Sequence, residues 1–592
     1  MARGTAGRWW TRPRTWEAAA TAAVTTLVAW PWLSPTQYVT VFDTVTYGGP
    51  NLAFTYAELR AGRLPAWDPT IFGGATHLGN PPAAVLYPVK LPFLWLDPAR
   101  ALDLITATHL YVLAAGVFVL FAWRLQLRPP AAFAGTAAMI GSGLVMVRSL
   151  QSEQIAVIAW IPWVLVTADW AIARAGPGRR SWRSGLPPAL PGRPTAATAV
   201  TVGLLLVAGH PQQVYMAIPV VGAWCVVRAV EHARDAQERW TAALRRLLAP
   251  VAGGVLGVGL AAAQLLVIVR QVPLAAATGQ RTLATPSGAD FALTPKLIAA
   301  ALLGSPLREK QIGTGGTLEA ATFVGVATVV LALVGIGVVV TRHRARLTGA
   351  LFVVLTVVGL VLSTGPQCTY QGPDQQSCST GGVVYRALFA VVPGFDQARV
   401  PARWLVLTVL GLAALAALAV DALVRREVRS RALAVAGGFG AVAIGVMLVA
   451  RVDLAPADVA DDSARTLATW LVLGVLAVAA VAAAWWVPTR RPALATAALL
   501  VPVVLLGLEV GAASLHNAAR AGLADEPFTA LGAPSPATCR TSPTGCWRCR
   551  RATSTPTTCR GRCARTATRP SACATSTATT AACRSPSRGS PP

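Results

Sequence analysis

The acidic side chains beside the long apolar stretches of this chain are its clearest candidates for chemistry. Asp43 follows the first apolar stretch, and Asp68 lies further along in the sequence Trp67-Asp68-Pro69. Glu153 and Glu319 each stand at the mouth of a later apolar stretch. A carboxylate within hydrogen-bond reach of a hydroxyl can take its proton as a general base. Ionisable groups at a membrane edge are costly and tend to face a cavity or a partner.

Each of these acids also has a structural interpretation. Asp43 could cap a helix in a loop, as a single Asp often does. Asp68 precedes a proline, which suits a turn whose carboxylate binds the local backbone. Glu153 and Glu319 could be solvated at the membrane interface, or they could contact an acceptor molecule or a metal. The residue types alone leave these alternatives open.

Two arginines form a candidate anion site. Arg399 and Arg403 precede an apolar stretch and are four residues apart, so they share one face if a helix has already begun. A guanidinium binds phosphate oxygens through a planar fork. Interfacial anchoring, or an ion pair with Asp396, explains the pair equally well.

A polar turn separates two other apolar stretches. It contains His210 followed by Gln212 and Gln213. These side chains could contact sugar hydroxyls or phosphate, or the histidine could cap the next helix. A single histidine with no nearby acid is a weak metal site, so the identity of any metal stays unknown.

The elements that must position these groups are membrane helices. A span needs about 20 largely apolar residues, and 54% of the residues are hydrophobic, 13% are charged and the mean hydropathy is +0.53. We predict an all-α polytopic integral membrane protein with about thirteen transmembrane helices, in a range of about 11–14. The predicted spans are 15–33, 104–123, 131–147, 154–173, 195–209, 212–230, 248–268, 320–340, 347–363, 403–424, 432–450, 467–487 and 492–513.

Arginines cluster after every second span, which marks those loops as cytoplasmic. The N-terminus (1–14) is then inside, the membrane domain covers 15–513, and the C-terminus is outside the cell membrane. The first span is longer than a signal-peptide core and lacks a clear cleavage site, so we expect it to be retained. The outer loops are 34–103, 270–319 and 364–402, and a linker (514–533) follows the last span. Any catalytic site is therefore expected to face the outside.

The net charge of +26 does not indicate a nucleic-acid partner. The arginines are dispersed over cytoplasmic loops and the tail rather than gathered on a soluble module. No Walker motif, no G-x-G-x-x-G after a strand and no H-E-x-x-H occurs, so ATP-driven transport and soluble nucleotide chemistry have no support.

The tail (534–592) differs in composition from everything before it. It is rich in Arg, Thr, Ser and Pro, has no acidic residue, and allows three interpretations: a zinc site, a disordered segment, or a frameshifted translation of a GC-rich gene. Because apolar periodicity is missing, the composition favours the third, and we expect no packed domain there. Its cysteines are Cys539, Cys546, Cys549, Cys559, Cys563, Cys573 and Cys583.

Three smaller features complete the pattern. Cys368 and Cys378 lie in one outer loop, where an oxidising exterior would let them form a disulfide. Cys225 lies inside a span and is expected to be a small core residue. The apolar stretches 83–96 and 296–303 are too short to span a membrane and are expected to be interfacial or re-entrant.

Several motifs follow one another in a recognisable order. After Asp43, the first outer loop contains Gly62-Arg63-Leu64-Pro65-Ala66-Trp67-Asp68-Pro69, Gly73-Gly74 and Tyr87-Pro88. Further along are Gly209-His210-Pro211-Gln212, Glu319-Ala320-Ala321-Thr322-Phe323-Val324-Gly325, Pro393-Gly394-Phe395 and Arg399-Val400-Pro401-Ala402-Arg403. Over residues 35–425 the chain resembles the YfhO-type bacterial membrane proteins, relatives of the GT-C class of glycosyltransferases. It departs from that family at Phe323, where Tyr is more common, and in the tail, where the family continues as an ordered outer segment.

The resemblance implies an integral membrane glycosyltransferase that moves a sugar from a polyprenyl-phosphate donor to a cell-envelope glycan, polymer or lipid. It assigns the catalytic base to the acid of the first loop, which makes Asp43 the first candidate and Asp68 the second. His210, Gln212, Glu153, Glu319, Arg399 and Arg403 are the candidate substrate-binding residues. No cofactor is certain, and a divalent cation is left open. The alternatives are a transporter or flippase for a lipid-linked saccharide, which no internal repeat supports, and a non-catalytic scaffold, which would tolerate loss of Asp43.

Overall fold

The computed structural model describes residues 15–40, 43–175, 192–271, 292–293, 298–303, 322–341, 346–372, 375–378, 382–449, 460–486 and 523–524. The chain divides into two compact units, Met1–Gly532 and Ala533–Pro592. The second unit, the predicted span 492–513 and Glu319 lie outside the described residues.

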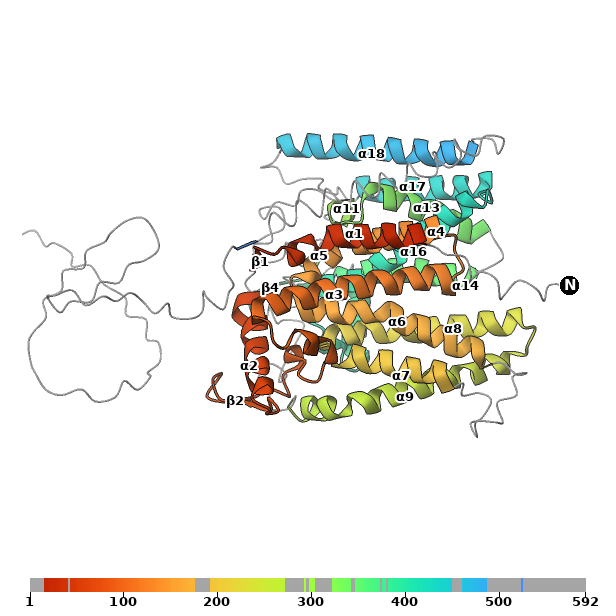
Figure 1. Cartoon of the computed structure of the whole chain (residues 1–592). Coiled ribbons are helices and arrows are strands. Elements are labelled where there is room, and N and C mark those ends of the chain that lie inside the picture. The colour runs from red at the N-terminus through yellow and green to blue at the C-terminus, as the bar shows by residue number, and fades with distance from the viewer. Residues whose placement is uncertain are drawn as a thin grey trace, which may run out of the picture. The chain divides into compact units, whose positions relative to one another are not determined.

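Long helices dominate the described part of the first unit (Figure 1). Each predicted span that falls within the described residues coincides with a helix, so the prediction of an all-α membrane protein is confirmed. The long helices are α1 (Thr15–Leu33), α3 (Pro98–Val119), α4 (Pro129–Ile140), α6 (Ser152–Arg174), α7 (Gly192–Val207), α8 (Pro211–Asp235), α9 (Trp240–Gln271), α13 (Val326–Thr341), α14 (Arg346–Ser363), α16 (Leu405–Val424), α17 (Ser430–Val449) and α18 (Ala460–Trp486).

The number of spans stays a prediction. Within the described ranges, 5 helices are long and apolar enough to cross a membrane by themselves, or up to 6 if a bent pair counts as one span. The bent pair is α4 and the short helix α5 (Gly143–Ser149), which meet at 52° where the sequence predicts one straight span, 131–147. Ser142 causes the break, because its hydroxyl accepts a hydrogen bond from the Val145 amide and so starts a new helix.

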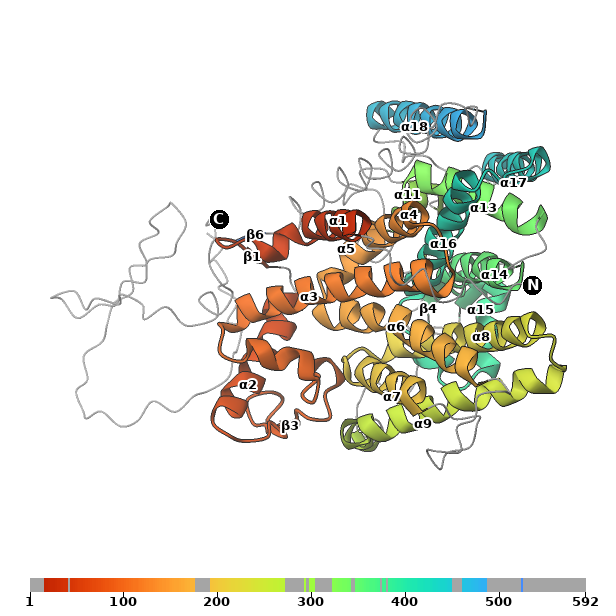
Figure 2. The same ribbon diagram turned by 45° about the vertical axis from the view of Figure 1, so that its right-hand side comes forward.

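Helix α16 forms the centre of the bundle. It packs against α13, α14 and α4, and nearly all of its residues are buried (Figure 2). Small residues allow these close approaches, as is usual between membrane helices. An added Cβ at Gly411 of α16 would lie 2.2 Å from the Thr356 hydroxyl of α14.

The first outer loop folds against one end of this bundle (Figure 1). It contains the π-helical turn η2 (Thr44–Gly48), α2 (Gly49–Arg60), the hairpin of β2 (Trp67–Asp68) and β3 (Ala75–Thr76), and the 3-10 turns η3 (Pro81–Ala83) and η4 (Pro88–Phe93). Tyr87 fixes the end of the loop, because its buried hydroxyl lies 2.5 Å from His109 Nε2 and accepts a 2.6 Å hydrogen bond from the Trp160 indole. The stretch 83–96 thus forms 3-10 turns, and 296–303 contains the short helix α11 (Ile298–Leu303).

Two further strand pairs in the described ranges involve later segments of the chain. Strand β1 (Tyr38–Val39) pairs antiparallel with β6 (Leu523–Ala524), so part of the predicted linker lies beside the chain that follows α1. Strands β4 (Cys368–Gly372) and β5 (Gln375–Cys378) form a hairpin that a Cys368–Cys378 disulfide closes. The predicted disulfide is confirmed, and Cys225 is a buried free cysteine as expected.

Candidate functional site

A cavity, called the outer cavity after the predicted side of the membrane, lies where the predicted first outer loop (34–103) meets α3 and the junction of α5 with α6. Its volume is about 170 Å³. Three carboxylates line it together with polar groups from the loop and from the start of α6. The lining residues include Asp43, Asp103, Thr106, Gln151 and Glu153.

Asp43 stands at the entrance to η2, on the rim of this outer cavity. Its side chain is exposed and makes no capping hydrogen bond to the turn that follows. Instead its carboxylate accepts a hydrogen bond from the Gln151 amide, which comes from the other wall of the cavity. The carboxylate is therefore held in position while it stays open to solvent.

A chain of glutamine amides leads from Asp43 into the bundle. Gln154 donates to Gln151, and Gln213 of α8 donates to Gln154 at 3.2 Å. Gln154 and Gln213 are almost fully buried, at 1% and 0% exposure. Because a buried amide is stable only when it is hydrogen-bonded, this chain fixes α6 and α8 relative to the first loop.

The polar turn that precedes α8 lies at the Gln213 end of this row of hydrogen-bonded glutamines. His210 caps α8, because its Nδ1 atom lies 3.2 Å from the backbone nitrogen of Gln213. Its Nε2 atom lies 3.3 Å from Arg403 Nη1. A neutral imidazole accepts at only one ring nitrogen, so one tautomer cannot serve both contacts. Gln212 accepts from the same Arg403 nitrogen at 2.9 Å. The structure thus brings the predicted residues His210, Gln212 and Arg403 together.

Gly209 explains how this turn reaches the cavity. Its φ is +111°, a conformation that side chains rarely allow. An added Cβ would lie 3.0 Å from the Pro81 carbonyl of η3 and 3.3 Å from Glu153 Cβ. A glycine is therefore required where the turn touches both the first loop and α6.

Glu153 is close enough to two cations and one anion for their charges to act on it. The charges of Lys90, Asp43 and Arg403 all act on its carboxylate. Lys90 follows the Tyr87-Pro88 motif, and its ammonium donates to the Ala83 carbonyl at 2.7 Å. Burial lowers the pKa of Lys90 to about 8, while the negative charge of Glu153 acts in the opposite direction. The region near Glu153 thus combines carboxylates with two cations.

The remaining predicted site residues lie elsewhere. Asp68 is buried, and its carboxylate accepts from the Thr70 amide at 2.8 Å and the Thr70 hydroxyl at 2.6 Å, which is a local turn. Arg399 is exposed, unlike the partly buried Arg403. Within the ranges that the structure describes, no three His, Cys, Asp or Glu side chains come together as metal ligands.

Sequence reasoning missed four members of the site: Lys90, Asp103, Gln151 and Gln154. A signal existed for Asp103, since an acid in a membrane helix is a functional candidate, but the predicted span 104–123 begins just after it. The glutamines carry no charge, and nothing in their spacing predicts that they join distant loops.

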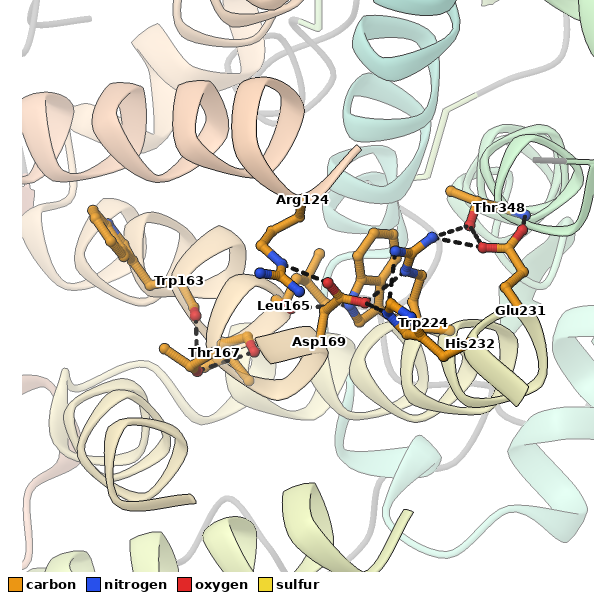
Figure 3. A network of polar contacts seen from close by, with 11 residues as sticks. Arg124, Trp163, Leu165, Thr167, Asp169, Trp224, Glu231, His232 and Thr348 are labelled. Carbon is orange, nitrogen blue, oxygen red and sulfur yellow. Dashed lines mark hydrogen bonds and ion pairs between the residues drawn. The ribbon is translucent and has the colours of Figure 1, made fainter. Parts of the chain in front are cut away.

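A second polar cluster, the Asp169 network, lies toward the C-terminal ends of α6 and α8, whereas the cavity lies at the start of α6. Figure 3 shows this network. Asp169 is fully buried and accepts from Arg124 at 2.5 Å and from Arg228 at 2.6 Å, with His232 Nε2 at 3.1 Å. Arg228 also donates to Glu231 at 2.6 Å, and Glu231 accepts from both the amide and the hydroxyl of Thr348. The cluster joins α6, α8 and α14 to the π-helical turn η5 (Leu120–Arg124) that continues α3.

Comparisons with known proteins give distant similarities only. No protein-family model matches the chain, and no curated protein matches it by sequence. The chain is similar to the arabinofuranosyltransferase AftD from Mycobacteria at 18% identity and a TM-score of 0.41, covering 75% of this chain and 27% of AftD. It is also similar to ArnT from Cupriavidus metallidurans, solved bound to undecaprenyl phosphate, at 13% identity and a TM-score of 0.44, covering 86% of this chain and 79% of ArnT. This chain thus spans about a quarter of the length of AftD. The resemblance to YfhO-type proteins stays a prediction.

Proposed function

We propose that the chain is an integral membrane glycosyltransferase that moves a sugar from a polyprenyl-phosphate donor to a hydroxyl of a cell-envelope acceptor. The observation that carries the proposal is the position of Asp43. This carboxylate is solvent-accessible on the rim of a cavity, and side-chain hydrogen bonds connect it to Gln213, the neighbour of Gln212, which accepts from Arg403. The cavity faces the outside of the cell if the arginine-rich loops are cytoplasmic.

In this mechanism Asp43 acts as the general base. It takes the proton of the acceptor hydroxyl while the acceptor oxygen forms a bond to the anomeric carbon of the sugar. The bond between that carbon and the phosphate oxygen breaks, and its electron pair leaves with the lipid phosphate. Proton, sugar and leaving group are thereby accounted for without any further reactant.

The leaving phosphate needs positive charge. Arg403 supplies a guanidinium that Gln212 orients, and Lys90 supplies an ammonium from the end of the first loop. Both charges act on Glu153, which borders the cavity. Hydrogen bonds from charged donors to phosphate are about twice as strong as neutral ones. We assign donor binding to these two cations.

Asp43→Asn tests the proposal directly. The amide is nearly isosteric with the carboxylate but cannot act as a base, so turnover should fall by about 10²–10⁴-fold while the protein remains inserted in the membrane. The assay is transfer from radiolabelled polyprenyl-phosphate sugars in membranes that express each variant. Asp68→Asn is the matched control, because Asp68 is the other acid of the loop and is bound to Thr70.

The two variants separate the competing functions. Loss of transfer in Asp68→Asn alone would move the base to Asp68. Near-normal transfer in both variants would refute a carboxylate base in this loop. A wild-type protein that moves the labelled lipid between leaflets without sugar transfer would make the chain a transporter.

A further inference from the structure

Asp103 is a buried carboxylate of the outer cavity to which the mechanism above gives no role. It lies in the second turn of α3, is 3% exposed, and lines the same cavity as Asp43 and Glu153. The Val39 amide of β1 donates a hydrogen bond to it. Its Oδ2 atom has no hydrogen-bond partner among the residues that the structure describes.

The nearest cation does not satisfy this oxygen. Arg100 Nη1 lies 3.9 Å from Asp103 Oδ2, beyond hydrogen-bond distance. The Arg100 guanidinium instead donates to the carbonyls of Ser34 at 2.6 Å and Pro35 at 3.2 Å, and it stacks over the Tyr38 ring at 4.4 Å. Arg100 therefore ties the chain after α1 to α3 and forms only a long ion pair with Asp103 Oδ2, which keeps no hydrogen-bond donor among the described residues.

Such an oxygen is costly for the folded protein. A buried acceptor without a donor carries the full desolvation penalty of its group, and the penalty is larger for a charged group. A functional site can require such a group even though it lowers the stability of the protein. A sugar ring offers hydroxyl donors of the required kind.

We infer that Asp103 is a sugar-binding residue whose Oδ2 accepts a hydrogen bond from a hydroxyl of the donor sugar held in the outer cavity. The inference rests on the proposed function, because it takes the cavity to hold a polyprenyl-phosphate sugar. Lys90 and Arg403 bind the phosphate of this donor, and Asp103 recognises its sugar. The residue selects the donor and takes no part in proton transfer.

Equilibrium binding of two probes to the purified full-length protein tests this role. The probes are radiolabelled undecaprenyl phosphate and a panel of undecaprenyl-phosphate sugars. Asp103→Leu should bind the sugar-bearing lipid about 10–100-fold more weakly than wild type, because a buried sugar hydroxyl would lose its acceptor. Its affinity for the sugar-free lipid should stay within about twofold of wild type, because the phosphate contacts are intact.

Thr106→Val is the matched control. Thr106 lines the same cavity one turn along α3, but its hydroxyl already donates to the Leu102 carbonyl at 3.0 Å. This variant should bind both probes as wild type does.

These binding measurements test the sugar-binding role of Asp103 whether or not the protein transfers sugar. Equal losses for both lipids, or no loss for the sugar-bearing lipid, in Asp103→Leu would each overturn the inference. So would a wild-type protein that binds the sugar-bearing lipid no more tightly than undecaprenyl phosphate. Sugar-selective binding that depends on Asp103, in a protein that transfers no sugar, would support the sugar site while refuting the proposed enzyme.

Discussion

The two ends of the helical bundle differ in how far their acidic side chains are hydrogen-bonded within the protein. At the Asp169 network, both carboxylate oxygens of Asp169 accept hydrogen bonds from arginines, and His232 adds a third contact (Figure 3). At the outer cavity, Asp43 is exposed with an amide partner, and one oxygen of Asp103 has no partner among the described residues. A carboxylate whose acceptor sites are filled within the protein holds helices together. A carboxylate with an oxygen that accepts no hydrogen bond within the protein can accept one from a ligand.

The largest expected effect tests the structural side of this comparison. Asp169→Ala would leave Arg124 and Arg228 buried without their shared partner, and breaking such a pair costs about 3–5 kcal/mol. We expect a strong fall in yield and in unfolding temperature, measured by size-exclusion chromatography of heated detergent extracts. Asp43→Ala is the control and should unfold like wild type.

The same experiment can contradict the structural role given to the Asp169 network. If Asp169→Ala folded as well as wild type but lost sugar transfer, then the Asp169 network would belong to the functional machinery. Activity per folded molecule should instead be preserved, since Asp169 lies near the end of α6 and the outer cavity lies at its start.

The sequence predicts the helices well because their signal is local. Apolar stretches and arginine loops are visible in any window of the chain, and the predicted span 154–173 differs from α6 by a few residues only. The break at Ser142 was not predictable in this way, because Gly143 also binds the Phe323 carbonyl at 2.7 Å, far along the chain.

The site was predictable only in part, for the same reason. Residues whose types carry chemistry, such as Asp43, His210 and Arg403, could be selected from the sequence. Their grouping depends on the contact of Gly209 with η3 and on the glutamine chain through Gln154, and both join segments distant in sequence. Composition and spacing contain no information on such contacts.

A second prediction concerns the arginine pair that the sequence treats alike. The structure separates them, because Arg403 contacts His210 and Gln212 whereas Arg399 is exposed. Arg403→Ala should raise the KM for the lipid donor about 10–100-fold, the equivalent of about 1.5–3 kcal/mol for a contact with a charged group. Arg399→Ala should raise it less. Donor titrations in the transfer assay measure both, and a larger effect at Arg399 would remove Arg403 from the donor site.

The smallest expected effect is a pH dependence that Lys90 sets. Burial lowers its pKa from 10.5 to about 8. As pH rises through about 8, the folded protein loses the Lys90 charge, so kcat/KM for the donor should fall above that pH. In the unfolded chain Lys90 keeps its proton up to the ordinary pKa of 10.5, so Lys90 costs stability below pH 8, and that cost disappears as pH rises from about 8 to 10.5.

Lys90→Arg should keep the charge and remove the fall in kcat/KM, and Lys90→Met should give a low, flat profile. A wild-type fall that persists unchanged in Lys90→Met would assign the titration to another group and take Lys90 out of the donor site.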